Sequence, residues 1–89
     1  MSVTKELVVP AAHEGLHCRV AVRLVAELGR FDAVVSFSCG AQVADGRSIV
    51  DLLALGCGPG CRLVVRAEGP EAAMAVAAVE QVLTDDGDG

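Results

Sequence analysis

A histidine stands in the segment GLHCRVA, residues 15–21, where the pattern of the chain turns helical. His17 would directly precede the first turn of that helix, whose leading N–H groups have no partner within the helix. Those N–H groups and the positive end of the helix dipole favour a bound anion and disfavour the imidazolium. A neutral imidazole beside an anion site suits reversible phosphorylation. Taken alone, the pattern also fits a helix cap or a surface histidine.

Charged and thiol side chains follow His17 on the first turns of this helix. Arg19 and Arg23 could offer fixed positive charge to phosphoryl oxygens. Phosphoryl transfer needs positioning and charge stabilisation more than covalent help from the protein. We therefore predict a phosphate-binding set of Cys18, Arg19 and Arg23. A thiol at a helix start can also gain reactivity, so a redox switch at Cys18 is an alternative.

A second helix start is predicted at Ser48, with Asp51 three residues later. This S-x-x-D pattern predicts a capping box, in which the serine hydroxyl accepts a helix N–H and the aspartate reaches back. Phosphorylation of Ser48 is the competing interpretation, with Arg47 beside the phosphate and Asp51 opposing it.

The helix that follows Ser48 has more apolar side chains than one core-facing stripe can use. We expect Leu52 and Leu55 in the core, which leaves Ile49, Val50 and Leu53 near the surface. A small exposed apolar patch usually marks a docking site. The alternative is a simple excess of core residues in a chain rich in Ala and Val.

The elements that position these residues follow from periodicity and turn signals. They are a strand at 3–9, a helix at 18–28, strands at 32–38 and 41–44, a helix at 47–55, a strand at 61–68 and a last helix opened by Pro70. This order favours an α+β fold, one antiparallel sheet with the helices on one face. Residues 1–84 form one domain, and the acidic tail 85–89 is expected to be flexible.

Composition limits the function classes. The 89 residues carry a formal net charge of -5, which argues against a broad basic face for nucleic acid or anionic lipid. No run of 18 apolar residues predicts a membrane span, and the N-terminus does not resemble a signal peptide. Four cysteines without an export signal predict reduced thiols and a cytoplasmic location.

Metal binding is the less favoured interpretation of the cysteines. GLHC is similar to the GMxCxxC loop of small heavy-metal domains, but Ala21 stands where the second thiolate would be needed. Cys57 and Cys61 have a C-x₃-C spacing without a second ligand pair. We expect no metal and no cofactor, packing or turn roles for Cys39, Cys57 and Cys61, and a solvent-exposed His13.

GLHCRVA resembles the GLHxRPA active-site segment of the HPr phosphocarriers of the bacterial phosphotransferase system. GRSIVDLLALG resembles the family's KSLxxLxxLG segment, and the likeness continues through GPGCRLVVRAEG into the last helix. The resemblance implies an open-faced βαββαβα sandwich with four antiparallel strands and three helices. It implies that His17 accepts phosphate at Nδ1 from phospho-enzyme I and passes it to an EIIA-type domain, with Arg19 as the second catalytic residue.

The resemblance also implies partners for the second helix. Enzyme I and acceptor domains bind there, which agrees with docking through Ile49, Val50 and Leu53. In part of the family the serine at the position of Ser48 is phosphorylated by an HPr kinase. We expect a monomer that serves sugar transport or signalling.

This sequence departs from the family pattern near the histidine. Val20 replaces the usual proline, Cys18 stands where threonine or alanine is common, and Glu14 adds a negative charge before the loop glycine. These departures keep a second hypothesis open, a non-transferring regulatory or interaction module on the same fold. A metal- or redox-responsive domain that uses Cys18 is the third.

Overall fold

The computed structural model describes residues 1–9, 18–56, 58 and 60–88 as an α+β fold with one sheet. The elements in chain order are β1 (Ser2–Val8), α1 (Cys18–Leu28), β2 (Val34–Cys39), β3 (Gln42–Asp45), α2 (Ile49–Ala54), β4 (Arg62–Glu68) and α3 (Ala72–Asp88). The strand order in the sheet is β1-β4-β2-β3. All three strand pairings are antiparallel. The predicted fold class is therefore confirmed.

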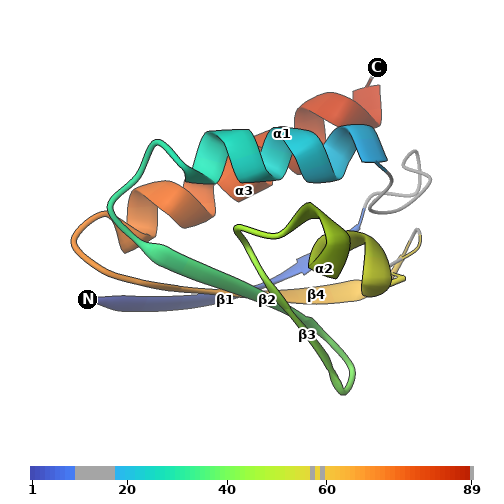
Figure 1. Cartoon of the computed structure of the whole chain (residues 1–89), viewed down its shortest axis with the longest axis horizontal. Coiled ribbons are helices and arrows are strands. Elements are labelled where there is room, and N and C mark those ends of the chain that lie inside the picture. Colours follow the sequence, from blue (N-terminus) through green and yellow to red (C-terminus); the bar gives the residue numbers. More distant parts are fainter. Residues whose placement is uncertain (10–17, 57, 59, 89) are drawn as a thin grey trace.

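All three helices lie on the same face of the sheet, and the other face is left uncovered (Figure 1). Because β4 is central, it pairs on one side with β1, with Leu7 opposite Leu63. On its other side it pairs with β2, with Phe37 opposite Val65. These pairs place alternate side chains on the helix side, as the two-residue period of a strand requires.

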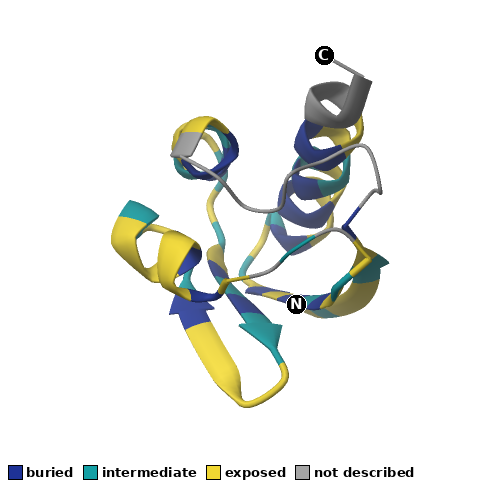
Figure 2. Ribbon diagram, turned by 90° about the vertical axis from the view of Figure 1, so that its right-hand side faces the viewer, coloured by how far each residue is buried: buried dark blue, intermediate teal, exposed yellow. Residues whose placement is uncertain are grey.

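The core lies between the helices and this inner face (Figure 2). On β4, Leu63, Val65 and Ala67 are fully buried, as their alternation predicts. On α1, Ala21 and Leu24 are fully buried and lie on the side of the helix that faces the sheet. On α3, the buried side chains Ala72, Val76, Val79 and Leu83 form a stripe that faces the core.

The start of α3 differs from the prediction. The helix begins at Ala72 instead of at Pro70, because a contact distant in sequence holds the preceding residues in a turn. The Glu71 carboxylate accepts a hydrogen bond from the Asp32 N–H at 2.8 Å. The Glu71 N–H in turn donates to the Asp32 carbonyl at 3.1 Å. This pair also explains why β2 begins at Val34, two residues later than predicted.

Gly69 permits this turn. Its φ is +137°, and a Cβ there would lie 2.7 Å from the Asp32 carbonyl oxygen and 3.0 Å from the Ala33 Cα. Only glycine combines that backbone conformation with so close an approach.

The end of α3 extends beyond the predicted domain boundary. The helical backbone runs to Asp88 and so includes most of the segment that the sequence predicts as a tail. The flexibility of residues 85–89 stays a prediction. Within the described ranges, no helix is both long enough and apolar enough to cross a membrane.

Candidate functional site

The first turn of α1 is anchored in the core through two small apolar residues. α1 begins at Cys18, so the residue after His17 in the chain is the first helical one, as predicted. Val20 and Ala21 are fully buried, while Arg19 is exposed and Arg23, one turn later, is half-buried. The helix therefore presents the motif arginine to solvent and fixes the motif's apolar residues against the sheet.

Several predicted residues near the start of α1 fall outside the described part of the chain. His17, His13 and Glu14 lie outside the described residues, as does the side chain of Cys18. The phosphate-binding set of Cys18, Arg19 and Arg23 and the catalytic pair of His17 and Arg19 thus stay predictions. The structure shows the backbone start of the helix on which three of these residues stand.

Val20 explains how the helix tolerates the loss of the usual proline. It is the third helical residue, within the first four whose N–H groups have no acceptor inside the helix. A proline there would remove no helical hydrogen bond, and a valine loses none. Its fully buried side chain anchors the turn through packing instead.

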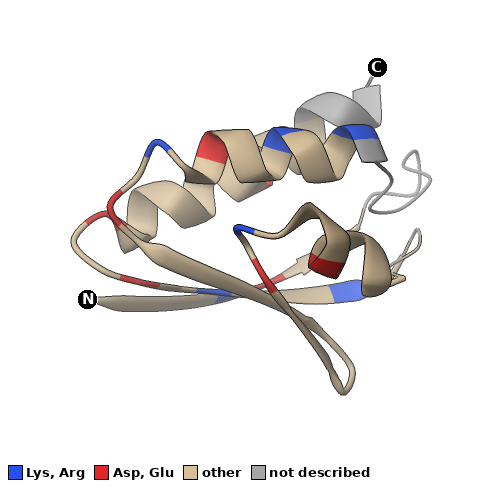
Figure 3. Ribbon diagram, in the orientation of Figure 1, with Lys and Arg blue, Asp and Glu red and all other residues tan. Residues whose placement is uncertain are grey.

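The charges along α1 run against the helix dipole. Arg19 lies in its first turn, Arg23 at its midpoint and Glu27 in its last turn (Figure 3). A helix alone favours the opposite order, acidic residues first and basic residues last. A cation in the first turn is stabilised when an anion binds beside it. The arrangement thus fits an anion site at the start of α1.

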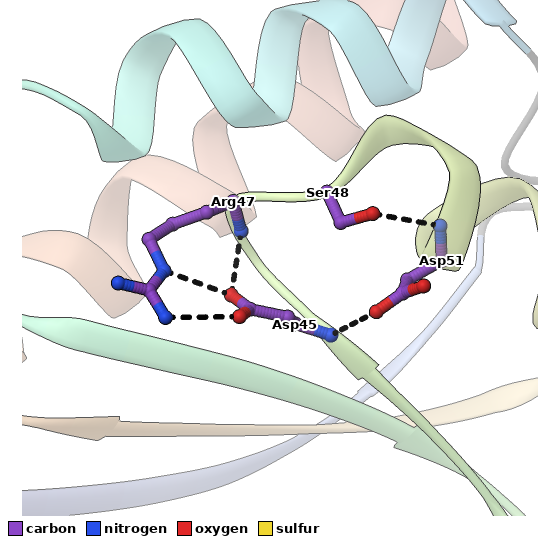
Figure 4. Close-up of polar contacts among 4 residues, drawn as sticks. All are labelled: Asp45, Arg47, Ser48 and Asp51. Carbon is purple, nitrogen blue, oxygen red and sulfur yellow. Dashed lines mark hydrogen bonds and ion pairs between the residues drawn. The ribbon is translucent and has the colours of Figure 1, made fainter.

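The start of α2 is closed by its own side chains (Figure 4). The Ser48 hydroxyl accepts a hydrogen bond from the Asp51 N–H at 3.1 Å, so the predicted N-cap is confirmed. The Ser48 N–H donates to the Asp45 carbonyl at 3.0 Å. The other half of the capping box is wrong: the Asp51 carboxylate accepts from the Asp45 N–H at 3.3 Å and not from Ser48. A capping box normally uses Glu or Gln, and aspartate is one methylene shorter.

Arg47 pairs with Asp45. Its Nη2 lies 3.0 Å from Asp45 Oδ2, and its Nε and backbone N–H both donate to Oδ1, at 3.2 and 2.9 Å. The hydrogen bonds from Arg47 lower the pKa of the Asp45 carboxyl below its ordinary value. The same contact raises the pKa of the guanidinium. Arg47 is therefore already engaged, whereas its predicted role was to lie beside a phosphate on Ser48.

The apolar residues of α2 divide as the sequence predicts except at Ile49, which was expected near the surface. Leu52 is fully buried and Leu55, just after the helix, is 7% exposed. Val50 is 75% exposed and Leu53 40% exposed, whereas Ile49 is partly buried against the core. The predicted surface patch therefore consists mainly of Val50 and Leu53. Its use in docking stays a prediction.

The described cysteines are partly buried. Cys39 ends β2, Cys61 precedes β4, and both pack against the core. This agrees with the packing role predicted for them, while Cys57 lies outside the described residues. Across the described part of the chain, no three His, Cys, Asp or Glu residues come together in a way that could hold a metal ion.

A small hollow between the end of β1 and the second half of α3 was not predicted from the sequence. It has a volume of about 90 Å³ and is lined by Leu7, Val8, Glu80, Leu83 and Thr84. At the same two elements, Lys5 Nζ lies 2.7 Å from Glu80 Oε1. Only the apolar pattern of the two elements could have signalled this hollow, because its lining residues are far apart in sequence.

Comparisons with known proteins agree on one family. Residues 3–85 match the family model of the PTS HPr component phosphorylation site. The phosphocarrier protein HPr of Vibrio cholerae serotype O1 is 37% identical over 65 residues, which are 73% of this chain and 76% of the relative.

Solved structures show the same architecture. The phosphocarrier protein HPr from Bacillus anthracis str. Ames superposes with a TM-score of 0.83 at 27% identity, over 91% of this chain and 95% of that one. HPr-C-His from Thermoanaerobacter tengcongensis superposes with a TM-score of 0.88 at 20% identity, over 98% and 97% of the two chains, a likeness of fold alone. With nearly the whole sequence matched and the fold shared, the chain belongs to the HPr family of phosphocarrier proteins.

Proposed function

We propose that His17 accepts a phosphoryl group from phospho-enzyme I and passes it to an EIIA-type acceptor domain. The Nδ1 lone pair attacks phosphorus while the bond between phosphorus and the donor atom of enzyme I breaks. The transfer to the acceptor repeats this exchange with His17 as the leaving group. No proton has to leave Nδ1, because the neutral tautomer that attacks through Nδ1 carries its proton on Nε2.

The charge order of α1 carries this proposal. Arg19 lies in the first turn of α1, at the positive end of the helix dipole, where the arginine and the dipole both attract an anion. A phosphoryl group on the preceding histidine is such an anion. We assign Arg19 to holding the phosphoryl oxygens during transfer, with Arg23 and the Cys18 position completing the phosphate-binding set.

Docking is assigned to α2. Val50 and Leu53 expose apolar surface at one helix, with Ile49 at its edge. An interface of this kind buries an apolar centre within a polar rim. Enzyme I and the acceptor would use this helix in turn, and we propose that the carrier acts as a monomer in the cytoplasm.

For Ser48 we propose the capping role over regulatory phosphorylation. Its hydroxyl oxygen already accepts the Asp51 N–H. A phosphate there would lie near the Asp51 and Asp45 carboxylates, and Arg47 is occupied by Asp45. An HPr kinase would therefore have to work against local charge repulsion.

The proposal is tested by incubating the protein with phosphoenolpyruvate and enzyme I from the same cell. Intact mass spectrometry should show one added phosphoryl group, lost on mild acid treatment. His17→Ala should abolish the addition, whereas His13→Ala, the matched control at the chain's second histidine, should leave it intact. Adding an EIIA-type domain should then remove the label. No added phosphate with a demonstrably active cognate enzyme I would favour a non-transferring module on this fold.

A further inference from the structure

The exposed side of α2 combines an apolar crest, formed by Val50, Leu53 and Ala54, with the single carboxylate of Asp51. Successive residues turn by about 100° around a helix. Because Leu52 is buried, Val50 and Ala54 lie on the outermost side, with Leu53 on one flank and Asp51 on the other. Both Ala54 and Asp51 are exposed. A protein that covers Val50 must therefore also come close to the Asp51 carboxylate.

The charge of this surface is net negative. Near the start of α2, Asp45 and Arg47 neutralise each other through three hydrogen bonds. Asp51 accepts one neutral backbone N–H, from Asp45 at 3.3 Å. In the part of the chain that the structure describes, no ion pair involves Asp51. One negative charge therefore stays uncompensated beside the apolar crest.

This charge restricts which partner can cover the crest. A partner that removes water around Asp51 without offering a cation leaves a poorly solvated carboxylate, which is unfavourable. An acidic partner adds repulsion, and the net charge of -5 extends that repulsion to longer range. A partner with a lysine or arginine at the rim of an apolar socket satisfies both parts of the surface.

We propose that enzyme I, the phosphoryl donor of this protein, receives Val50 and Leu53 in an apolar socket. The rim of that socket carries a cationic side chain opposite Asp51. The inference rests on the proposed function, because it names the chemistry of the partner that docks on α2. It adds the prediction that carrier recognition depends on negative charge at α2.

The test compares two isosteric charge removals. Asp51→Asn keeps an oxygen that can accept the Asp45 N–H, and Glu6→Gln is the matched control. Glu6 lies on β1 opposite Val64, is exposed, and is on the sheet face that the helices leave uncovered. Initial rates of phosphoryl transfer from cognate phospho-enzyme I are measured against carrier concentration, at low salt and at high salt, with thermal unfolding of each variant as the fold control.

At low salt Asp51→Asn should raise KM about 1.5- to 5-fold, the range for an exposed ion pair, with kcat unchanged. Glu6→Gln should leave KM unchanged. The difference between the variants should vanish near 1 M salt, where the screening length is about 3 Å. Equal KM values for the two variants, or a lower KM for Asp51→Asn, would overturn the inference while the proposed function stands.

Two further outcomes also decide against it. A wild-type chain that takes no phosphate from active enzyme I would refute the proposed function and the inference together. A wild-type dimer in sedimentation that Val50→Asp dissociates would make the crest an interface between copies of this chain, and would overturn the inference together with the proposed monomeric state.

Discussion

The starts of α1 and α2 differ in what lies beside their leading N–H groups, which have no acceptor inside the helix. At α2 the Ser48 hydroxyl and the Asp51 carboxylate engage N–H groups around the first turn, and Asp45 holds Arg47. At α1 the sequence offers no acidic residue in the first turn, and Arg19 stands there instead. At the α2 start the Asp51 N–H is engaged by the protein's own Ser48 side chain, whereas we assign the α1 start to binding an anion.

This difference separates chemistry from recognition. A helix start closed by its own side chains gains stability and presents a fixed surface, which is what a docking helix needs. A helix start with cations near its positive end is less stable alone but can hold a phosphoryl group. The family's phosphocarrier role needs both, and we assign them to two adjacent helices (Figure 1).

The largest effect is expected from the buried side of α2. Leu52→Ala removes a fully buried side chain and should lower the free energy of unfolding by about 2–5 kcal/mol. Leu53→Ala, next to it but 40% exposed, should lower it by less than about 1 kcal/mol and instead weaken docking. Urea denaturation measures both values. Equal destabilisation by the two variants would show that α2 does not have distinct core and docking sides.

The next largest effect is expected on the rate of phosphoryl transfer when Arg19 of α1 is removed. Arg19→Ala should lower kcat/KM for phosphoryl transfer by about 100- to 1000-fold, the range for loss of one group that stabilises transition-state charge. Arg30→Ala is the control at the opposite end of the helix, where Arg30 pairs with Glu27 at 3.1 Å. Its rate should match the wild type. Unchanged transfer by Arg19→Ala would remove the role assigned to this arginine.

A smaller effect is expected at the cap of α2. Ser48→Ala loses the acceptor for the Asp51 N–H and should destabilise the protein by about 0.5–2 kcal/mol. Ser48→Asn keeps an acceptor and should restore most of that loss. Thermal unfolding compares the three proteins, and phosphate uptake from enzyme I should be the same in all of them. Loss of uptake in Ser48→Ala with intact folding would contradict the separation of the two helix starts.

The smallest effect is a pH dependence at Asp45. Arg47 lowers the pKa of this carboxyl in the folded protein, so the pair stabilises the fold above the ordinary aspartate value of 3.8 and loses that contribution as pH falls through the lowered pKa. Arg47→Ala should raise the pKa of Asp45, as followed by its carboxyl carbon signal in NMR. The stability difference between wild type and Arg47→Ala should shrink in acid. A pKa of Asp45 that does not move would show that the pair is not formed in solution.

The sequence was sufficient where a local pattern alone decides the structure. The bounds of α1 match the prediction because its apolar spacing is regular and Gly29 follows its last residue. The division of α2 into buried Leu52 and exposed Val50 also follows from helical geometry, since one short helix has one core-facing side.

Contacts between distant residues decided the rest. α3 begins at Ala72 and not at the predicted Pro70, because Asp32, from the turn before β2, forms hydrogen bonds with Glu71. Asp51 bonds the N–H of Asp45 because β3 brings that residue within reach. Neither contact has a signal in local sequence. The identity of the phosphorylated residue rests on the motif and the family match, because His17 lies outside the described residues.

The most direct test locates the phosphoryl group. After reaction with phosphoenolpyruvate and cognate enzyme I, the chain is digested at neutral to alkaline pH, which preserves phosphohistidine, and the peptides are fragmented in a mass spectrometer. The account predicts a phosphoryl group on His17 and none on Ser48 or His13. A phosphoryl group on Ser48 or His13 with His17 unmodified would contradict the assignment of the α1 start as the site of chemistry.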